Sequence, residues 1–311
     1  MGGALFPPPG TIERWAKFIV VGDSFSEGLW DPYPLDDGTL VPDGTESDAR
    51  QRGWADRLAT ALSARRVAAG LPELLYANLA IRGKLIGQIA VEQLPDALAQ
   101  KPDLISVMGG GNDILRPGVD IDTISDQLDS AVAAARQAGA DVLMCTGFKA
   151  SRTLAWTRGA VGQFNSNIWA IAREHGAYVL DLWTMKCLGD LRLWSDDRIH
   201  LNSEGHRRVM NAALRGLGLS PDDDDYDALL PPEPEPEPVE RVEKVVGHDR
   251  AVKVQARALR LKGDAQWAGQ HAAPWIARRA ERRSSGDGRE AKYPTANPWP
   301  PQRGSCGQLI W

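Results

Sequence analysis

The sequence predicts an α/β protein in which a parallel sheet is covered by helices on both faces. Short apolar runs of four or five residues, typical of strands buried on both sides, alternate with longer stretches of helical apolar spacing. The chain has 311 residues, of which 43% are hydrophobic, so it can bury a sizeable core. Because strands and helices alternate, parallel strands joined by crossover helices are the expected arrangement.

The expected elements follow one another between residues 17 and 218. The predicted strands are residues 18–21, 75–79, 104–108, 142–145 and 177–180. The predicted helices are residues 54–69, 85–99, 121–138, 163–174 and 205–217. Gly70 and Gly139 stand just past two of these helices, where a left-handed residue is favoured. Since active sites of such folds lie at the carboxyl ends of the strands, a catalytic motif should directly follow a strand.

The chain beyond residue 220 differs sharply in composition. Residues 221–243 contain ten acidic residues and one arginine among repeated prolines, which predicts a stiff, solvated linker. Residues 244–311 contain thirteen Lys or Arg and five acidic residues. We therefore expect an N-terminal segment (1–16), a catalytic domain (17–220), the acidic Pro-rich linker (221–243) and a basic C-terminal extension (244–311). The extension is expected to be partly helical or disordered.

Charge and cysteine content narrow the class of protein. The net charge of −5 argues against nucleic acid as a partner of the whole chain. The three cysteines (Cys145, Cys187 and Cys306) are odd in number and widely spaced, which predicts neither a disulfide framework nor a zinc site. Prolines 7–9 occupy the place where a signal peptide needs its apolar stretch, and no apolar run is long enough to span a membrane. We expect a soluble, cytoplasmic protein whose oligomeric state is open.

A serine and a histidine stand where a hydrolytic site would need them. Ser24 lies between Gly22 and Gly28, immediately after the first predicted strand. A serine hydroxyl is a weak nucleophile and needs a neighbouring base. His200 is suited to that task because its ordinary pKa lies near neutrality, and Asp197 could fix its tautomer. Taken alone, Ser24 could equally cap a helix, and an Asp-x-x-His pattern is common by chance.

Two further loops offer hydrogen-bond donors for an oxyanion. Gly83 follows the second predicted strand, and without a side chain its N–H could approach a substrate closely. Asn112 follows Gly109–Gly110–Gly111 after the third strand, and an amide side chain is a suitable oxyanion donor. A phosphate-binding glycine loop is the competing interpretation, but the spacing and the Lys-Ser/Thr ending of such loops are missing.

Together, Ser24, Gly83, Asn112 and His200 resemble the four family-naming positions of the SGNH, or GDSL, serine hydrolases, with Asp197 at the third triad position. The resemblance covers about residues 17–216. It implies a flavodoxin-like three-layer α/β/α sandwich, esterase or lipase activity, and catalytic residues Ser24, Asp197 and His200. It also implies an oxyanion hole from the Ser24 and Gly83 N–H groups and the Asn112 side chain, with no cofactor or metal. Local segments such as Gly53–Leu58 are similar to an actinobacterial-type subgroup.

Neighbouring polar residues are expected to play lesser roles. Arg82 and Lys84 flank Gly83 and are expected to point into solvent. Asp23 and Asp113 are expected to hydrogen-bond within their loops. His206 lies on a predicted helix and is expected at the surface or partly buried.

Two alternatives to ester hydrolysis remain open at this stage. The same residues would serve an acyltransferase that passes the acyl group to an alcohol or sugar. A protein of a different class would bind an acidic partner through its basic C-terminal extension, where Arg278–Arg283 form a charged cluster. The substrate of the proposed esterase, a lipid, small-molecule or sugar ester, depends on the shape of a pocket that motifs do not encode.

Overall fold

The computed structural model describes residues 7–33, 51–149, 152–234, 248–267, 269, 286–303 and 309–310. The chain forms two compact units. The first combines Met1–Ala228 with Ser285–Trp311, and the second is Leu229–Ser284.

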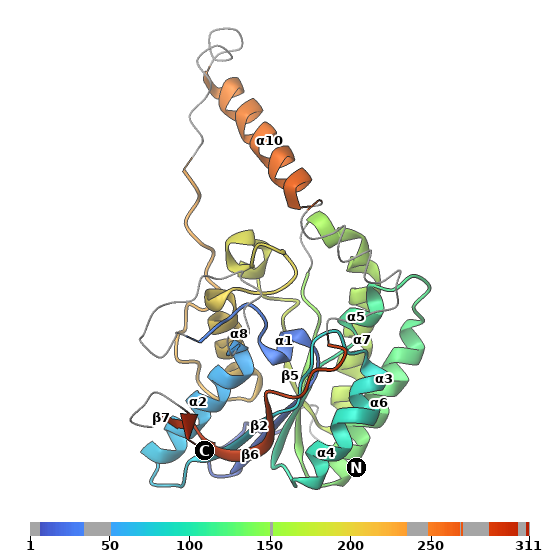
Figure 1. The fold of residues 1–311 in the computed structure, drawn as a ribbon, viewed down its shortest axis with the longest axis vertical. Coiled ribbons are helices and arrows are strands. Elements are labelled where there is room, and N and C mark those ends of the chain that lie inside the picture. The colour runs from blue at the N-terminus through green and yellow to red at the C-terminus, as the bar shows by residue number, and fades with distance from the viewer. Residues whose placement is uncertain are drawn as a thin grey trace. The chain divides into compact units, whose positions relative to one another are not determined.

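A six-stranded sheet runs through the first unit in the order β5-β4-β3-β1-β2-β6 (Figure 1). Five strands are parallel: β1 (Lys17–Val21), β2 (Leu74–Asn78), β3 (Leu104–Val107), β4 (Asp141–Cys145) and β5 (Tyr178–Leu180). The sixth, β6 (Tyr293–Trp299), pairs antiparallel with β2. The predicted parallel sheet is therefore confirmed.

Helices cover both faces of this sheet. On one side, α2 (Gly53–Ala68) packs on α8 (Ser203–Gly216), and these helices contact β2 and β5 respectively. The other side carries a broken helix of three parts, α3 (Ile86–Gln88), the π-helical turn η1 (Ile89–Gln93) and α4 (Leu94–Ala99). It is completed by α6 (Ile121–Gln137) and α7 (Arg158–His175), visible beside α3 and α4 in Figure 1. The arrangement is the expected three-layer α/β/α sandwich.

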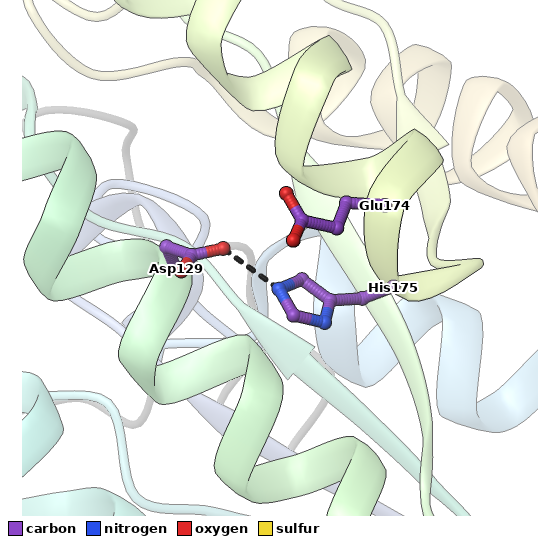
Figure 2. A group of neighbouring side chains, drawn as sticks. All are labelled: Asp129, Glu174 and His175. Atoms are coloured by element: carbon purple, nitrogen blue, oxygen red, sulfur yellow. Dashed lines mark hydrogen bonds and ion pairs between the residues drawn. The ribbon is translucent and has the colours of Figure 1, made fainter.

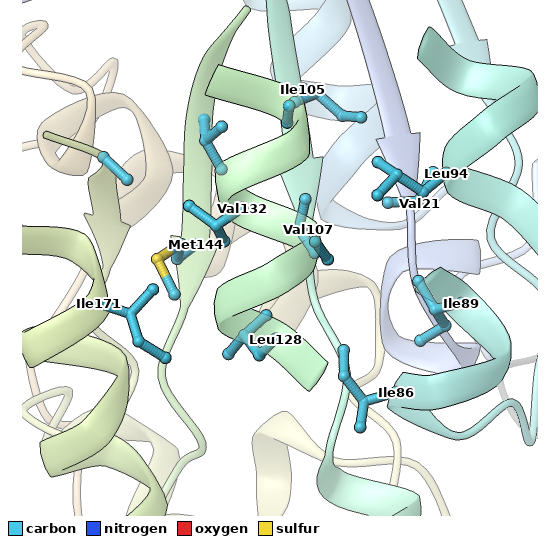
Figure 3. Packing of buried hydrophobic residues seen from close by; sticks show 14 of the residues in the cluster. Val21, Ile86, Ile89, Leu94, Ile105, Val107, Leu128, Val132, Met144 and Ile171 are labelled. Atoms are coloured by element: carbon cyan, nitrogen blue, oxygen red, sulfur yellow. The ribbon is translucent and has the colours of Figure 1, made fainter. Parts of the chain in front are cut away.

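The strands bury alternate side chains toward the two helical layers, because successive residues of a strand point to opposite faces. One face forms a continuous apolar core with α3, η1, α6 and α7 (Figure 3). Its strand side includes Val21, Ile105, Val107 and Met144, and its helical side includes Ile86, Ile89, Leu128, Val132 and Ile171. This packing holds the strand ends in fixed positions, so the loops that follow the strands start from a rigid base.

The strand order places the loops after β1 and β3 next to each other. β1 lies between β2 and β3, and the chain leaves β1 toward β2 but leaves β3 toward β4, on the opposite side. In open α/β sheets, ligands bind in the crevice that forms outside the carboxyl ends at such a switch point. Two short helices begin there, α1 (Ser24–Glu27) after β1 and α5 (Gly111–Ile114) after β3.

The end of the chain differs from the division expected from sequence. Residues 244–311 were expected to form one basic extension, whereas β6 belongs to the sheet and its residues group with the first unit. The segment has no alternating apolar pattern and contains Pro294 and Pro298, which an edge strand tolerates. Its burial comes from Tyr293 and Trp299 at its two ends, 3% and 1% exposed. Beyond it, β7 (Gln302–Arg303) and β8 (Leu309–Ile310) form a separate two-stranded ribbon.

The second unit contains one long helix, α10 (His248–Trp267), in the part of it that the structure describes. Val254, Leu259 and Leu261 on this helix are about half exposed or more. The cluster Arg278–Arg283 lies outside the described residues. Of the helices in the described ranges, none combines the length and apolar character that crossing a bilayer requires.

Candidate active site

Ser24 is the first residue of α1, directly after the turn that leaves β1. Asp23 caps this short helix, since its Oδ1 accepts a hydrogen bond from the Phe25 N–H at 3.1 Å. Gly28 ends the helix in the left-handed conformation, with a φ of 86°. The chain therefore turns sharply enough to present the Ser24 hydroxyl at the carboxyl end of the sheet, as the sequence predicts.

His200 lies beside Ser24 although 176 residues separate them. The Nε2 atom of His200 is 2.8 Å from the Ser24 Oγ, and its Nδ1 is 2.6 Å from Oδ2 of Asp197. The three predicted triad residues thus form one hydrogen-bonded chain. This arrangement lets the imidazole carry a proton at Nδ1 and accept one from the serine at Nε2.

A tight loop fixes Asp197 against the imidazole. Its Oδ1 accepts hydrogen bonds from the Ser195 hydroxyl at 2.7 Å and from the N–H groups of Ile199 and His200 at 2.9 and 3.0 Å. Arg198, inside this loop, adopts a φ of 55°, which non-glycine residues rarely do. Burial alone would raise the pKa of Asp197, but the His200 imidazole and these hydrogen bonds hold it well below its ordinary value. Asp197 is therefore ionised throughout the neutral range.

Asn112 lies on α5, across the switch point from Ser24. Its Nδ2 donates to the carbonyl of Lys84 at 3.1 Å and more weakly to Oδ2 of Asp23 at 3.4 Å. Gly110, with a φ of 94°, precedes α5, and a Cβ there would lie 2.5 Å from the Phe164 ring. The glycine loop thus provides the close packing that presents Asn112, rather than a phosphate cradle.

Gly83 is held between two hydrogen-bonded neighbours. The Arg82 N–H donates to Glu27 of α1 at 2.7 Å, and the Lys84 carbonyl accepts from Asn112. Gly83 adopts a φ of 77°, where a side chain would be strained. In the described part of the chain, the N–H groups of Ser24 and Gly83 have no hydrogen-bond acceptor. Both N–H groups are therefore available as hydrogen-bond donors.

Two carboxyl groups next to the site behave as loop residues, as expected. Asp113 accepts a hydrogen bond from the Ile86 N–H at 3.1 Å, which ties α5 to α3. Burial raises the pKa of Asp23 to about 6, and the Asp113 and Glu27 carboxylates add to this, while the Phe25 N–H and His200 oppose it. Asp23 therefore changes its protonation state close to neutral pH, beside the amide of Asn112.

Three residues depart from their expected environments. Arg82 was expected in solvent, but it is 8% exposed and its guanidinium pairs with Glu27 of α1. Lys84 pairs with Glu92 and has a side chain only 19% exposed. His206 is buried: its Nδ1 accepts from the Trp54 N–H at 3.2 Å and its Nε2 lies 3.3 Å from the Leu29 carbonyl. Sequence gives no signal for these pairings, because the partners come from separate elements.

A cavity of about 120 Å³ opens beside the catalytic groups. Ser24, His200 and Asn112 line it together with Asp23, and its remaining walls are mostly apolar. These walls include Met108, Ile114, Leu115, Phe148, Leu154, Val161, Phe164 and Ile199. Cys145 also contributes, but burial raises the pKa of its thiol well above the ordinary value, so it stays protonated. The cavity suits an apolar group held next to the serine.

One group of possible metal ligands lies elsewhere, on α6 and α7 (Figure 2). Asp129, Glu174 and His175 bring their ligand atoms within 4.8 Å of one another. His175 Nε2 is 2.7 Å from Oδ1 of Asp129, so an ordinary side-chain hydrogen bond already accounts for the contact. Because Glu174 is exposed and none of the three lines the cavity, the cluster has no evident part in the candidate site.

Comparisons with known proteins identify a family and a shared fold. A family model described as the GDSL-like Lipase/Acylhydrolase family matches residues 20–208. The acetylxylan esterase Axe2 from Geobacillus stearothermophilus is 22% identical with a TM-score of 0.51, over 70% of this chain and 97% of that chain. A variant of Axe2 is 23% identical with a TM-score of 0.52, over 67% and 97%. No curated protein matches the chain.

A psychrotrophic esterase, EstA from Pseudoalteromonas sp., is also similar, at 16% identity and a TM-score of 0.49 over 65% of this chain and 96% of that chain. At such low identities, the likeness to Axe2 establishes a shared fold. The family match extends from β1 into α8 and includes every residue of the candidate site.

Proposed function

The chain belongs to the GDSL-like lipase/acylhydrolase family and is a carboxylic ester hydrolase, and we propose that it works through an acyl-enzyme on Ser24. The observation that carries this proposal is the hydrogen-bonded chain from Ser24 through His200 to Asp197, with contacts of 2.8 and 2.6 Å. These are the distances at which a general base can take the proton of a nucleophile.

In the first half of the reaction, His200 Nε2 takes the proton of the Ser24 hydroxyl as Oγ attacks the carbonyl carbon of the ester. A tetrahedral intermediate forms with its negative charge on the former carbonyl oxygen. When it collapses, the bond to the alcohol oxygen breaks, and His200 gives its proton to the departing alcohol. In the second half, His200 activates a water molecule, which releases the acid and restores Ser24.

The negative charge of the intermediate would be held by three donors, the N–H groups of Ser24 and Gly83 and the Asn112 side-chain amide. Such preorganised donors are worth roughly 10²- to 10³-fold in turnover each. The position of Gly83 between Arg82, tied to α1, and Lys84, tied to Asn112, supports its place among them. Asp197 keeps the imidazole in the tautomer that can accept the serine proton, and stabilises the cation that forms.

The cavity supports a substrate with an apolar acyl group longer than acetyl. Axe2 is an acetylxylan esterase, but an acetyl group offers only one methyl to the apolar walls that Leu154, Val161 and Phe164 provide here. A cavity near 120 Å³ is about ten times the roughly 10–15 Å³ that admits one water-sized group. We therefore propose short- to medium-chain esters, with acyl groups of roughly four to eight carbons.

A series of p-nitrophenyl esters from acetate to palmitate tests both parts of the proposal. The expected kcat/KM rises from acetate to a maximum between butyrate and octanoate and falls for longer chains. Acid quenching during turnover of the best substrate should leave the acyl mass on the peptide that contains Ser24. A maximum at acetate would contradict the acyl-chain assignment, and an acyl group on another residue would contradict the assignment of the nucleophile.

A further inference from the structure

The segment that ends in β6 is part of the core of the first unit. Trp299 packs its ring 4.7 Å from that of Tyr76 on β2, and Tyr293 lies 6.2 Å from the same ring. The indole N–H of Trp299 donates to the Thr60 hydroxyl of α2 at 2.9 Å, and the Trp299 carbonyl accepts from Ser63. These contacts fix the strand on β2 and α2, although more than 200 residues separate it from them.

Lys292, just before β6, inserts its ammonium group among backbone carbonyls and one carboxylate. Its Nζ donates to the carbonyl of Glu27 at 2.6 Å, to those of Gln51 and Arg52 at 2.9 and 3.0 Å, and to Oδ2 of Asp56 at 3.0 Å. The lysine side chain is 11% exposed and that of Asp56 is fully buried. A buried ammonium group whose donors are all used in hydrogen bonds holds its acceptor groups in fixed positions.

The acceptors of Lys292 belong to α1, which carries Ser24, and to α2 and the residues just before it. Glu27 is the last residue of α1, the helix that begins with Ser24, and Gln51 and Arg52 lead into α2. The backbones of α1 and α2 touch at Gly28 and Gly53, where a Cβ on Gly28 would lie 2.5 Å from the Gly53 Cα. Lys292 therefore joins the end of α1 to the start of α2 at their closest approach.

The same segment also reaches the loop that carries Gly83. Gly286 lies directly against the backbone of Arg82. A Cβ on Gly286 would be only 2.0 Å from the Arg82 carbonyl oxygen, so the contact requires glycine. The Arg82 N–H in turn donates to the Glu27 side chain. Residues 286–292 thus contact both the helix that holds Ser24 and the loop that holds Gly83.

We propose that Lys292 is a positioning residue of the esterase, and that the segment from Gly286 to Trp299 completes its active site by fixing α1 and the Gly83 loop. The inference rests on the proposed roles of Ser24 and Gly83. It also makes the catalytic unit discontinuous in sequence, with the second unit, Leu229–Ser284, inserted between its two parts.

The test uses the full-length chain with Lys292→Met, and Lys253→Met on the exposed face of α10 as the matched control. We expect Lys292→Met to lower kcat by about ten- to a hundredfold with KM nearly unchanged, since small displacements of reacting groups cost this much. The control should behave as the wild type. Wild-type kcat in a folded Lys292→Met protein would overturn the proposal.

A second variant separates positioning from folding stability. Lys292→Met alone leaves the Asp56 carboxylate buried without its cation, which is destabilising. Asp56→Asn combined with Lys292→Met removes both charges, so the thermal midpoint should recover while kcat stays low, because the carbonyls of Glu27, Gln51 and Arg52 still lack their donor. Recovery of kcat together with stability would show a purely structural role and refute the proposal.

A measurement that does not depend on ester hydrolysis keeps the two proposals distinguishable. Amide hydrogen exchange of residues 24–28 and 82–84 should be faster in Lys292→Met than in the wild type and unchanged in Lys253→Met. Unchanged exchange in these two segments would refute positioning by Lys292 even if Ser24 proves to be the nucleophile. Conversely, Lys292→Met could show faster exchange while Ser24→Ala keeps full esterase activity. That combination would support positioning by Lys292 and contradict the acyl-enzyme on Ser24.

Gly286→Ala gives an independent check on the contact with the Gly83 loop. The added methyl group would press on the Arg82 carbonyl, so we expect a lower kcat with Lys292 intact. Gly189→Ala is the matched control, because a Cβ at this exposed position meets nothing within 4 Å. Equal kcat in both alanine variants would contradict the role assigned to Gly286.

Discussion

Replacing Asp197 with asparagine tests the triad through one well-defined change. Oδ1 of Asp197 accepts from the Ser195 hydroxyl and from the N–H groups of Ile199 and His200. An asparagine must place its oxygen at that position, since its NH₂ group there would face two N–H donors. The NH₂ group then points at His200 Nδ1, the atom that now lies 2.6 Å from Oδ2.

The magnitude follows from this forced orientation. Facing a donor, Nδ1 of His200 must carry a lone pair, so the single ring proton moves to Nε2 and points at Ser24 Oγ, 2.8 Å away. In that tautomer the imidazole cannot accept the serine proton. A wrong tautomer in a triad of this kind lowers kcat by about 10⁴-fold. At about 1.4 kcal/mol per decade, this raises the barrier by roughly 5–6 kcal/mol.

The assay is steady-state hydrolysis of p-nitrophenyl butyrate by the wild type and Asp197→Asn. Asp196→Asn is the matched control, because Asp196 is the exposed neighbour of Asp197. Circular dichroism and thermal unfolding establish that all three proteins are folded. A folded Asp197→Asn variant that retains more than a tenth of the wild-type kcat would refute the assignment of Asp197 and His200.

Three further predictions concern the oxyanion, the cavity and a buried histidine. Asn112→Ala should lower kcat by roughly 10²- to 10³-fold with little change in KM, since its amide acts in the transition state; a rise in KM at constant kcat, measured with the same ester, would assign it to ground-state binding. Val161→Phe should fill the cavity and lower kcat/KM for octanoate about 100-fold relative to acetate, since each methylene that is no longer buried costs about 0.8 kcal/mol. An unchanged ratio of the two kcat/KM values would place the acyl chain elsewhere. Burial lowers the pKa of His206 to about 4 from 6.5, so the folded state loses stability as pH falls from about 6.5 to 4, by up to roughly 3 kcal/mol. Urea unfolding at both pH values should show this loss in the wild type but a much smaller one in His206→Asn, and equal losses would contradict the assignment.

The layers of the fold were predictable because their physical signals are local. Each parallel strand is a mostly apolar run, and the helices carry apolar residues at helical spacing, so the observed bounds agree with the expected ones to within a few residues. The helix expected at residues 163–174 begins earlier in the structure, at Arg158, and ends at His175. Its start was placed too late because its first turn lacks the apolar pattern on which the prediction depends. Sequence therefore places the ends of β1 and β3, where Ser24 and Asn112 lie.

β6 and its neighbouring contacts were not predictable in this way. Tyr293 and Trp299 are buried by pairing with β2, a contact across more than 200 residues that no local pattern reports. Arg82 was expected in solvent, and nothing in the sequence around Lys292 indicates burial. Only the folded chain brings Arg82 to the Glu27 side chain and Lys292 to the Glu27 carbonyl. What sequence cannot supply here is the set of long-range pairings that hold the catalytic loops in place.

The central claim is that Ser24 is the nucleophile, and its most direct test compares Ser24→Ala with Ser26→Ala. Ser26 is the matched control, because it lies on the same short helix, is fully buried, and has no hydrogen-bond partner for its hydroxyl among the described residues. With p-nitrophenyl butyrate as substrate, Ser24→Ala should remain folded and lose at least 10³-fold in kcat, while Ser26→Ala should hydrolyse the ester nearly as fast as the wild type. Hydrolysis by folded Ser24→Ala at the wild-type rate would contradict the account.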